Sequence, residues 1–260
     1  MADFQYLASS IQDKVCTLTI SNPPANMLSR AVLTELNTFF DQIAVDKNVK
    51  VLIITTTGSF FIVGADIKEI SEINGAAEGR KASALGQMVI SKLENLPIPS
   101  IAVIQGHCLG GGNELVMAAT IRLANERARF GQPEINLGII PGFGGTQRLT
   151  RIVGLSKGLE LCLTGDMING KTAEAIGLVS KALPEDQLMK EAQGMAKKIA
   201  AKSRPAIERI LKLGRKGLEM PLEKALEWEA DLFGEVCETY DMKEGLRGFL
   251  EKRPPKFEDR

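Results

Sequence analysis

Two continuous apolar segments, each ending at a glycine, constrain the fold of this chain most strongly. They read VKVLIITTTG (49–58) and SIAVIQG (100–106). A segment that is apolar at nearly every position, rather than at alternate ones, is typical of a strand buried on both faces of a sheet. Helical patterns accompany them, because apolar residues return at three- and four-residue intervals from Ser29 onward and a second helical stretch surrounds 80–96. Strands and helices therefore alternate.

The rest of the chain first continues this alternation of strands and helices and then becomes mainly helical. VCTLTI (15–20) predicts a further strand, and 120–134 reads as short strands and turns. From about residue 171 the pattern is nearly all helical, with one clear break at 182–187. We therefore predict an α/β fold with a helical C-terminal appendage.

The length of 260 residues suits one large domain, or one domain with an appendage. We expect a core over residues 1–200 and a C-terminal helical region over 201–260. In that region an apolar stripe follows Pro221, a residue suited to the first turn of a helix. The stripe is compatible with packing on the core or against a second subunit, and its members are Leu222, Leu226, Leu232, Phe233 and Val236.

Composition narrows the classes of partner and compartment. The formal net charge is zero, which weighs against nucleic acid as a partner, and no apolar segment is long enough to cross a membrane. The four cysteines form no CxxC pair, so we expect reduced thiols and a cytoplasmic protein. The first residues lack the layout of a signal peptide, so we expect the mature chain to start at or near Met1, with a removed mitochondrial leader as the alternative.

Three glycine-rich corners follow strands or strand-like segments, at 64–66, 110–112 and 142–145. Glycine lets the backbone approach a ligand closely, and the free N–H groups of a first helical turn attract negative charge. Such corners bind either an oxyanion or a phosphate. No Lys-Ser or Lys-Thr follows them and none contains GxGxxG, so a P-loop and a dinucleotide fingerprint are not supported.

Two glutamates accompany these corners. Glu114 falls in the first helical turn after Gly112, and Glu134 lies 20 residues further on between turn signals. Two carboxyl groups near one oxyanion hole can perform acid–base chemistry if their surroundings keep them in different protonation states. Burial raises either pKa and a helix N-terminus lowers that of Glu114, and the sequence does not decide between these effects.

Four segments closely resemble the crotonase superfamily and, within it, the enoyl-CoA hydratases: FFIVGADIKEI, HCLGGGNEL, FGQPEINLGIIPGFGGTQRL and LTGDMINGKTAEAIGLV. The resemblance runs from about residue 12 to about residue 255. It implies an α/β spiral of repeated ββα units with a C-terminal helical region used for trimerisation. It also implies a homotrimer, or a hexamer formed from two trimers.

The resemblance assigns roles to residues of this chain. It implies that the backbone N–H groups of Ala65 and Gly111 form the oxyanion hole for a thioester carbonyl. It implies that Glu114 and Glu134 hold one water and add it across the double bond of a 2-trans-enoyl-CoA. The remaining implied substrate-binding residues are Asp66, Ile67, Lys68 and Gly142. The chemistry needs no metal and no redox cofactor, because coenzyme A enters as part of the substrate.

Several alternatives remain beside an enoyl-CoA hydratase. Within the superfamily they are a hydratase for branched or aromatic acyl groups, an isomerase or a thioester hydrolase, and Glu114 weighs against pure isomerisation. Outside catalysis the alternative is RNA binding. Val63 stands where relatives often carry a small residue, so it either narrows the site or repacks it. His107 and Cys108 are expected to be structural, and Lys68 and Lys252 either meet coenzyme A phosphates or are solvated.

Overall fold

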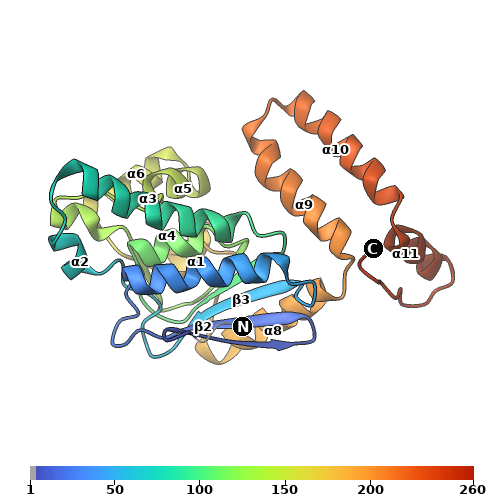
Figure 1. Ribbon diagram of the computed structural model, residues 1–260, viewed down its shortest axis with the longest axis horizontal. Helices are drawn as coiled ribbons and strands as arrows, with labels where there is room; N and C mark the ends of the chain where they lie inside the picture. Colours follow the sequence, from blue (N-terminus) through green and yellow to red (C-terminus); the bar gives the residue numbers. More distant parts are fainter. Residues whose placement is uncertain (1–3) are drawn as a thin grey trace.

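A six-stranded sheet with helices on both faces organises the chain (Figure 1). The computed structural model describes residues 4–260, so the expectation about Met1 lies outside the described residues. Within 4–260 the strands are β1 (Leu7–Gln12), β2 (Val15–Ile20), β3 (Val51–Thr56), β4 (Ser100–Ile104), β5 (Cys108–Leu109), β6 (Ile121–Asn125), β7 (Arg129–Gly131), β8 (Ile168–Asn169) and β9 (Lys181–Leu183).

The α-helices of the same residues are α1 (Arg30–Val45), α2 (Ile67–Ser71), α3 (Gly75–Glu94), α4 (Gly111–Met117), α5 (Gly145–Val153), α6 (Leu155–Thr164), α7 (Gly170–Ala175), α8 (Glu185–Ala200), α9 (Arg204–Lys216), α10 (Leu222–Cys237) and α11 (Tyr240–Leu250). Two 3₁₀ helices accompany them, η1 (Pro133–Leu137) and η2 (Gly217–Glu219). The α/β fold predicted from the alternation is confirmed. The short strands expected within 120–134 are β6 and β7, whereas the sequence pattern did not reveal β1, β5 or β8, or that β5, β7 and β8 form a separate small sheet.

The large sheet has the strand order β1-β2-β3-β4-β6-β9. Its first pair is antiparallel, and every later neighbour is parallel. Parallel neighbours require crossover connections, which the intervening helices supply. Parallel strands also bring their carboxyl ends to one edge of the sheet. The glycine corners that follow β3 and β4 therefore come together at this edge.

The strand β3 shows why its sequence is apolar at successive positions. Val51 and Ile53 pack on one side of the sheet with Leu188 of α8. Leu52 and Ile54 belong to the main core on the other side, which contains residues of α1, α3 and α4. Since side chains alternate across a strand, a sheet covered on both faces needs apolar residues at both sets of positions.

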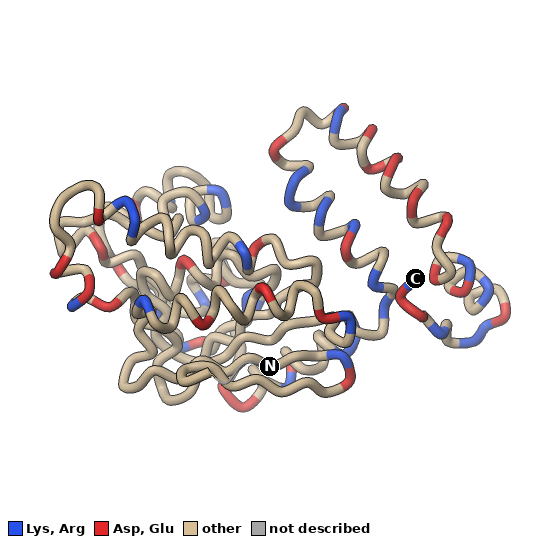
Figure 2. Tube along the Cα trace, viewed as in Figure 1, with Lys and Arg blue, Asp and Glu red and all other residues tan. Residues whose placement is uncertain are grey.

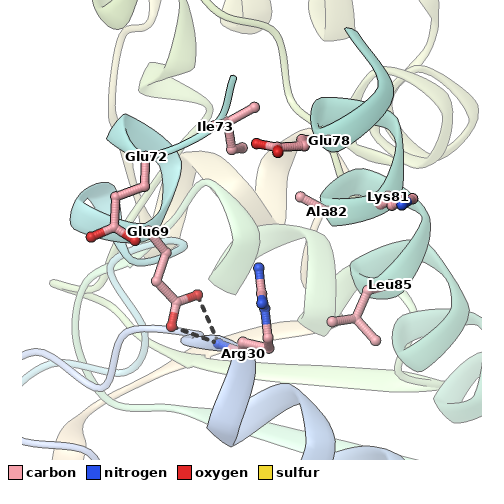
Figure 3. A pocket seen from close by; sticks show the side chains of 8 residues that line it. All are labelled: Arg30, Glu69, Glu72, Ile73, Glu78, Lys81, Ala82 and Leu85. Carbon is pink, nitrogen blue, oxygen red and sulfur yellow. Dashed lines mark hydrogen bonds between the residues drawn. The ribbon is translucent and has the colours of Figure 1, made fainter. Parts of the chain in front are cut away.

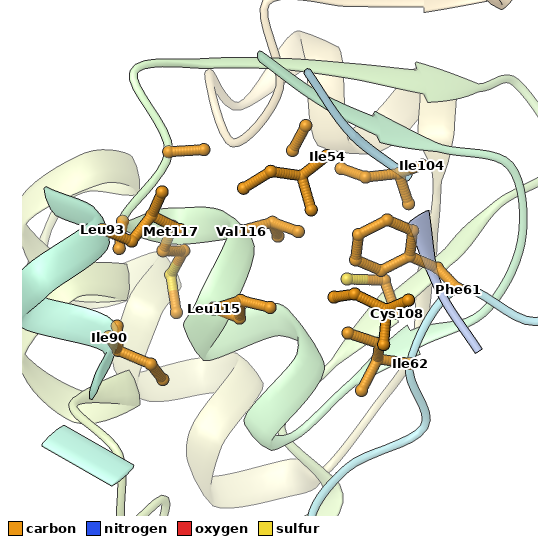
Figure 4. Packing of buried hydrophobic residues seen from close by; sticks show 14 of the residues in the cluster. Ile54, Phe61, Ile62, Ile90, Leu93, Ile104, Cys108, Leu115, Val116 and Met117 are labelled. Atoms are coloured by element: carbon orange, nitrogen blue, oxygen red, sulfur yellow. The ribbon is translucent and has the colours of Figure 1, made fainter. Parts of the chain in front are cut away.

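The short helix α4 is anchored in the main core (Figure 4). All seven of its residues are buried. Leu115, Val116 and Met117 project among apolar side chains that include Ile54 and Phe61. The first turn of α4 thus begins from a rigid base, which matters because it carries Glu114.

The helices α9, α10 and α11 stand away from the sheet (Figure 1). Basic residues predominate along α9. Acidic residues predominate along α10, which runs beside α9 (Figure 2). Arg209 pairs with Glu235 at 2.9 Å, and Lys212 Nζ lies 5.3 Å from the centroid of the Trp228 ring. No helix within residues 4–260 has the length and apolar character needed to cross a membrane.

The apolar stripe after Pro221 divides between two environments. Leu232 is buried, whereas Leu222, Leu226 and Phe233 are exposed. The stripe therefore does not fold back on the core as a whole. The division of the chain at residue 200 stays a prediction.

Candidate active site

A cavity of about 810 Å³ opens beside the glycine corners. Its walls come from α2, α3, η1 and the loop before α5. Ala65, Gly111, Glu114 and Glu134 all line it, although they are far apart in the sequence. The fold thus brings together the four residues on which the proposed chemistry depends.

Each glycine of the triplet at the start of α4 meets a different neighbour. Gly110 has φ +49°, and a Cβ there would lie 2.7 Å from Glu134 Oε1. A Cβ on Gly111 would lie 3.4 Å from the backbone N of Ala65. A Cβ on Gly112 would lie 2.2 Å from the carbonyl oxygen of Ile62. The first two positions keep the cavity open, and the third permits helix and loop to pack.

Ala65 and Gly111 both line the cavity, and their backbone amides are the two candidate donors. The first N–H groups of a helix have no acceptor within it, and Gly111 is the first residue of α4. Neither amide donates a hydrogen bond to another group among residues 4–260. Ala65 is fixed by a bridge to Leu28, whose amide donates to the carbonyl of Gly64 at 2.9 Å. Two such donors can stabilise an oxyanion.

Glu114 is 1% exposed and bonds to the loop before α5. Its Oε1 accepts hydrogen bonds from the amides of Phe143 at 2.8 Å and Gly145 at 2.6 Å. Burial and the charge of Glu134 raise the pKa of Glu114 to about 7, against the lowering effect of these two amides and of Arg148. A carboxyl with a pKa near neutrality exchanges protons readily at physiological pH.

Glu134 lies on η1, the single 3₁₀ turn that follows β7. Its Oε2 is buried and has no hydrogen-bond partner within residues 4–260. Burial also raises the pKa of Glu134. A buried carboxyl oxygen without a partner is costly unless it serves the site. Oε2 is therefore free to bind a group held in the cavity.

The loop at 142–145 contributes more than the sequence indicated. Sequence reasoning identified Gly142 but missed the amides of Phe143 and Gly145 as the donors that hold Glu114. A Cβ on Gly145 would lie 2.3 Å from Gln132 Nε2 and 3.0 Å from Glu114 Oε1. The GFGG segment is visible in the sequence. Its contact with Glu114, which lies 31 residues before Gly145, is not.

The other residues assigned from the resemblance take different places. Asp66 lines the cavity and also caps α2, since its Oδ1 accepts from the amide of Lys68 at 2.9 Å. Ile67, Gly142 and Val63 line the cavity. Lys68 is exposed and is not among the residues of the cavity wall. Its contact with substrate stays a prediction.

His107 and Cys108 have the surroundings of structural residues. The His107 ring meets Phe60 edge-on, with centroids 5.3 Å apart. The backbone carbonyl of His107 accepts hydrogen bonds from the amides of Phe61 and Ile62. Cys108 is fully buried, and desolvation raises the pKa of its thiol well above the usual value. A thiol in this state is a poor nucleophile.

A second hollow of about 570 Å³ adjoins the main cavity between α2, α3 and the start of α1 (Figure 3). Charged side chains dominate its wall, among them Arg30, Glu69, Glu72, Glu78 and Lys81. The amide of Arg30 donates to Glu69 Oε2 at 2.9 Å. Five residues, including Arg30 and Glu69, line both spaces. The main cavity and the charged hollow therefore share part of their walls.

The fold and the site define an α/β protein in which a buried and a half-buried glutamate line the same cavity as two backbone amides without an acceptor within residues 4–260. The family model described as enoyl-CoA hydratase/isomerase matches residues 10–260. A probable enoyl-CoA hydratase of Bacillus subtilis is 45% identical over 96% of this chain and 98% of its own length. A short-chain-enoyl-CoA hydratase of Clostridium acetobutylicum is 41% identical over 93% of each chain. The crystal structure of an enoyl-CoA hydratase from Bacillus anthracis superposes with a TM-score of 0.94 at 36% identity, covering 98% of this chain and 100% of that one.

The chain belongs to the enoyl-CoA hydratase/isomerase family. The family resemblance seen in the sequence is confirmed.

Proposed function

We propose that this protein is an enoyl-CoA hydratase that adds water to a 2-trans-enoyl-CoA and yields the 3-hydroxyacyl-CoA. One observation carries the proposal: Glu114 and Glu134 line the same cavity as the amides of Ala65 and Gly111. The enoyl-CoA hydratases of Bacillus subtilis and Clostridium acetobutylicum support it through their similarity over nearly the whole chain.

The addition needs one group that takes a proton and one that gives a proton. One glutamate removes a proton from water as the water oxygen bonds to the β-carbon. The π electrons of the double bond then move toward the thioester, and negative charge develops on its oxygen. The other glutamate delivers a proton to the α-carbon, which restores the carbonyl. One proton is taken and one is given, so the pair is ready for another turnover after a proton exchange.

The surroundings of the two carboxyls suit this division of labour. Oε1 of Glu114 already accepts two amide hydrogen bonds, so its Oε2 is the oxygen available for proton transfer. Glu134 also has one oxygen without a partner. The charge of Glu134 raises the pKa of Glu114, so the protonation state of one glutamate affects that of the other.

The enolate intermediate needs donors where its charge develops. The amides of Ala65 and Gly111 supply two without any rearrangement of side chains. One such donor typically contributes about 10²–10³ in rate. The proposed chemistry thus uses two carboxyls and two amides. That it requires no metal or redox cofactor is part of the proposal, and activity measured in the presence of a chelator tests this.

The decisive experiment follows the loss of the conjugated enoyl absorbance of crotonyl-CoA with the wild type, Glu114→Gln and Glu134→Gln. We expect fast hydration by the wild type and a loss of about 10²–10⁴-fold in each variant, since neither glutamate can replace the other. Near-normal hydration by Glu134→Gln would contradict the two-carboxyl mechanism. A series of longer, branched and aromatic enoyl-CoA substrates then defines the acyl preference.

We also propose that the protein is a homotrimer, or a hexamer of paired trimers. Exposed apolar residues on the outlying helices support association, among them Leu226, Phe233 and Phe249. Light scattering of the wild type and of Phe233→Glu tests the proposal. A monomeric wild type would contradict it, and dissociation of the variant would locate the interface on α10.

We place the protein in the cytoplasm as a further proposal. The four cysteines are free thiols, and three of them are buried. A reducing compartment keeps such thiols unmodified. Fractionation of the source cells tests this location.

A further inference from the structure

One face of α3 reaches the loop that holds Glu114. Ser83 Oγ donates a hydrogen bond to the carbonyl of Gly142 at 2.5 Å. Gln87 Nε2 donates to the same carbonyl at 3.0 Å and to Ser83 Oγ at 3.0 Å. Residues four apart on a helix share a face, so the two side chains act on one acceptor together.

That carbonyl belongs to the same peptide unit as the amide that binds Glu114. The carbonyl of Gly142 and the N–H of Phe143 lie in one rigid plane and point in opposite directions. Fixing the carbonyl therefore fixes the N–H, which donates to Glu114 Oε1 at 2.8 Å. Two donors on the carbonyl also polarise the peptide and strengthen its N–H as a donor.

Gly86, the residue before Gln87 on α3, packs against the same loop. The ring of Phe143 lies so close to Gly86 that a Cβ there would stand 2.2 Å from the ring carbon Cδ1. The next carbonyl of the loop, that of Phe143, accepts from Arg148 Nη1 at 3.1 Å. Arg148 is itself paired with Glu94 of α3 at 2.6 Å. The helix thus holds the loop on both sides of the peptide that meets Glu114.

We infer that Ser83 and Gln87 are positioning residues that hold the Gly142–Phe143 peptide so that its amide orients Glu114 for proton transfer. The inference rests on the proposed hydratase function, because it deepens the role of Glu114 in that reaction. Both side chains also line the cavity. The orientation of Glu114 is therefore set by the same helix that borders the space for the acyl group.

The charged and titratable groups around Glu114 come from three neighbouring elements. Glu134 on η1 raises its pKa, and Arg148 on α5 lowers it. Cys162 on α6 is close enough for both glutamates to raise the pKa of its thiol. None of these groups is altered when Ser83 or Gln87 is replaced. A weaker bond from Phe143 N then raises the pKa of Glu114, because that bond favours the ionised carboxylate.

The test compares Ser83→Ala, Gln87→Met and the double variant with the wild type in the hydration of crotonyl-CoA. We expect kcat to fall roughly tenfold for Ser83→Ala and further for the double variant, with KM changed less than about twofold. The limb of the pH–rate profile that reports Glu114 should move upward by about half a pH unit or more. Ser83→Thr keeps a hydroxyl and should recover most of the activity.

Thr38→Ala is the matched control. It removes a hydroxyl that donates to a helix carbonyl, that of Thr34 at 3.1 Å, on the exposed side of α1. We expect its activity and pH profile to equal those of the wild type. Thermal unfolding of every variant corrects the rates for any loss of folded protein.

An unchanged kcat and pH profile in the double variant would overturn the inference. So would a fall in stability with an unmoved pH profile, because that result describes a merely structural contact. If the wild type does not hydrate any enoyl-CoA, the proposed function fails by itself. The positioning of Glu114 is then decided by NMR titration of isotopically labelled glutamate, in which an identical pKa in wild type and Ser83→Ala overturns the inference.

Discussion

The carboxyl group of Glu114 and the backbone amide of Gly145 are joined by a hydrogen bond of 2.6 Å that spans 31 residues of sequence. The bond links the first turn of α4 to the first residue of α5. It explains the glycine, since a Cβ at position 145 would press on Glu114, Pro141 and Gln132. Gly145 is thus needed both for the hydrogen bond to Glu114 and for the close packing of the loop.

Gly145→Ala should damage both activity and stability. The added Cβ would lie 2.7 Å from Pro141 Cβ, so the loop must shift and Glu114 loses a donor. We expect kcat to fall by at least about tenfold and the free energy of unfolding by about 1–3 kcal/mol. Gly194→Ala in α8 is the control, because nothing lies within 4 Å of its Cβ. There the change should stabilise the helix slightly, and equal effects at both positions would contradict the prediction.

Gly111→Ala should separate activity from folding. Its Cβ would lie 3.4 Å from Ala65 N, an ordinary contact, and 3.3 Å from the ring carbon Cδ2 of Phe143, which must move by only a few tenths of an ångström. We expect a folded protein whose kcat/KM for crotonyl-CoA falls about 10²–10³-fold, because the added methyl group stands beside Ala65 N and keeps the carbonyl oxygen from reaching the two amides. Gly112→Ala, with a Cβ 2.2 Å from Ile62 O, should instead reduce the yield of folded protein. Circular dichroism and the hydration assay distinguish these outcomes, and a fully active Gly111→Ala would exclude its amide from the oxyanion hole.

Glu114→Gln should stabilise the protein near pH 8 while it abolishes activity. The folded state raises the pKa of Glu114 from 4.5 to about 7 and so favours the protonated form. The contribution of Glu114 to stability is therefore greatest below about pH 4.5 and is lost as the pH rises through about 7, on the order of 3 kcal/mol in total. The glutamine side chain of the variant carries no charge, so the variant does not lose this stability as the pH rises. Urea unfolding at pH 5 and pH 8 should show the variant's advantage only at the higher pH, and an advantage independent of pH would refute this explanation.

Asp259→Asn should destabilise the protein through a buried lysine. Asp259 pairs with Lys50, whose side chain is 3% exposed, and with Lys14, which is 48% exposed. Burial raises the pKa of Asp259, but hydrogen bonds from both lysines outweigh this and lower it. The stabilisation is thus present above about pH 4 and is lost as the pH falls below it.

We expect Asp259→Asn to cost about 3 kcal/mol at pH 7, because it leaves the Lys50 charge poorly compensated. Lys14→Ala should cost no more than about 1 kcal/mol, as exposed pairs usually do. Denaturant unfolding measures both. If Lys14→Ala lowered the free energy of unfolding as much as Asp259→Asn does, the prediction would be wrong. The burial of Lys50 would then not explain how much its ion pair with Asp259 stabilises the protein.

Much of the fold followed from local patterns. The apolar segments at 49–58 and 100–106 predicted β3 and β4, because strands covered on both faces need apolar residues throughout. Helix signals were equally direct, as Ser29 caps α1 through a bond to the amide of Val32. The strand β1 was not predicted because half of LASSIQ is polar and most of it is exposed, so no regular apolar pattern marks it. It is defined by its pairing with β2 rather than by its own residues.

The residues of the candidate site were visible in the sequence as glycine corners and two glutamates. The sequence determined that backbone amides could approach a ligand there, since glycine carries no side chain. Only the tertiary structure decided which groups meet. It set Glu114 against the amides of Phe143 and Gly145, and it left one oxygen of Glu134 without a partner. It also brought Ser83 and Gln87 to the carbonyl of Gly142. The physical reason is that pKa values and hydrogen bonds depend on burial and on neighbours distant in sequence, whereas turn and strand preferences depend on adjacent residues.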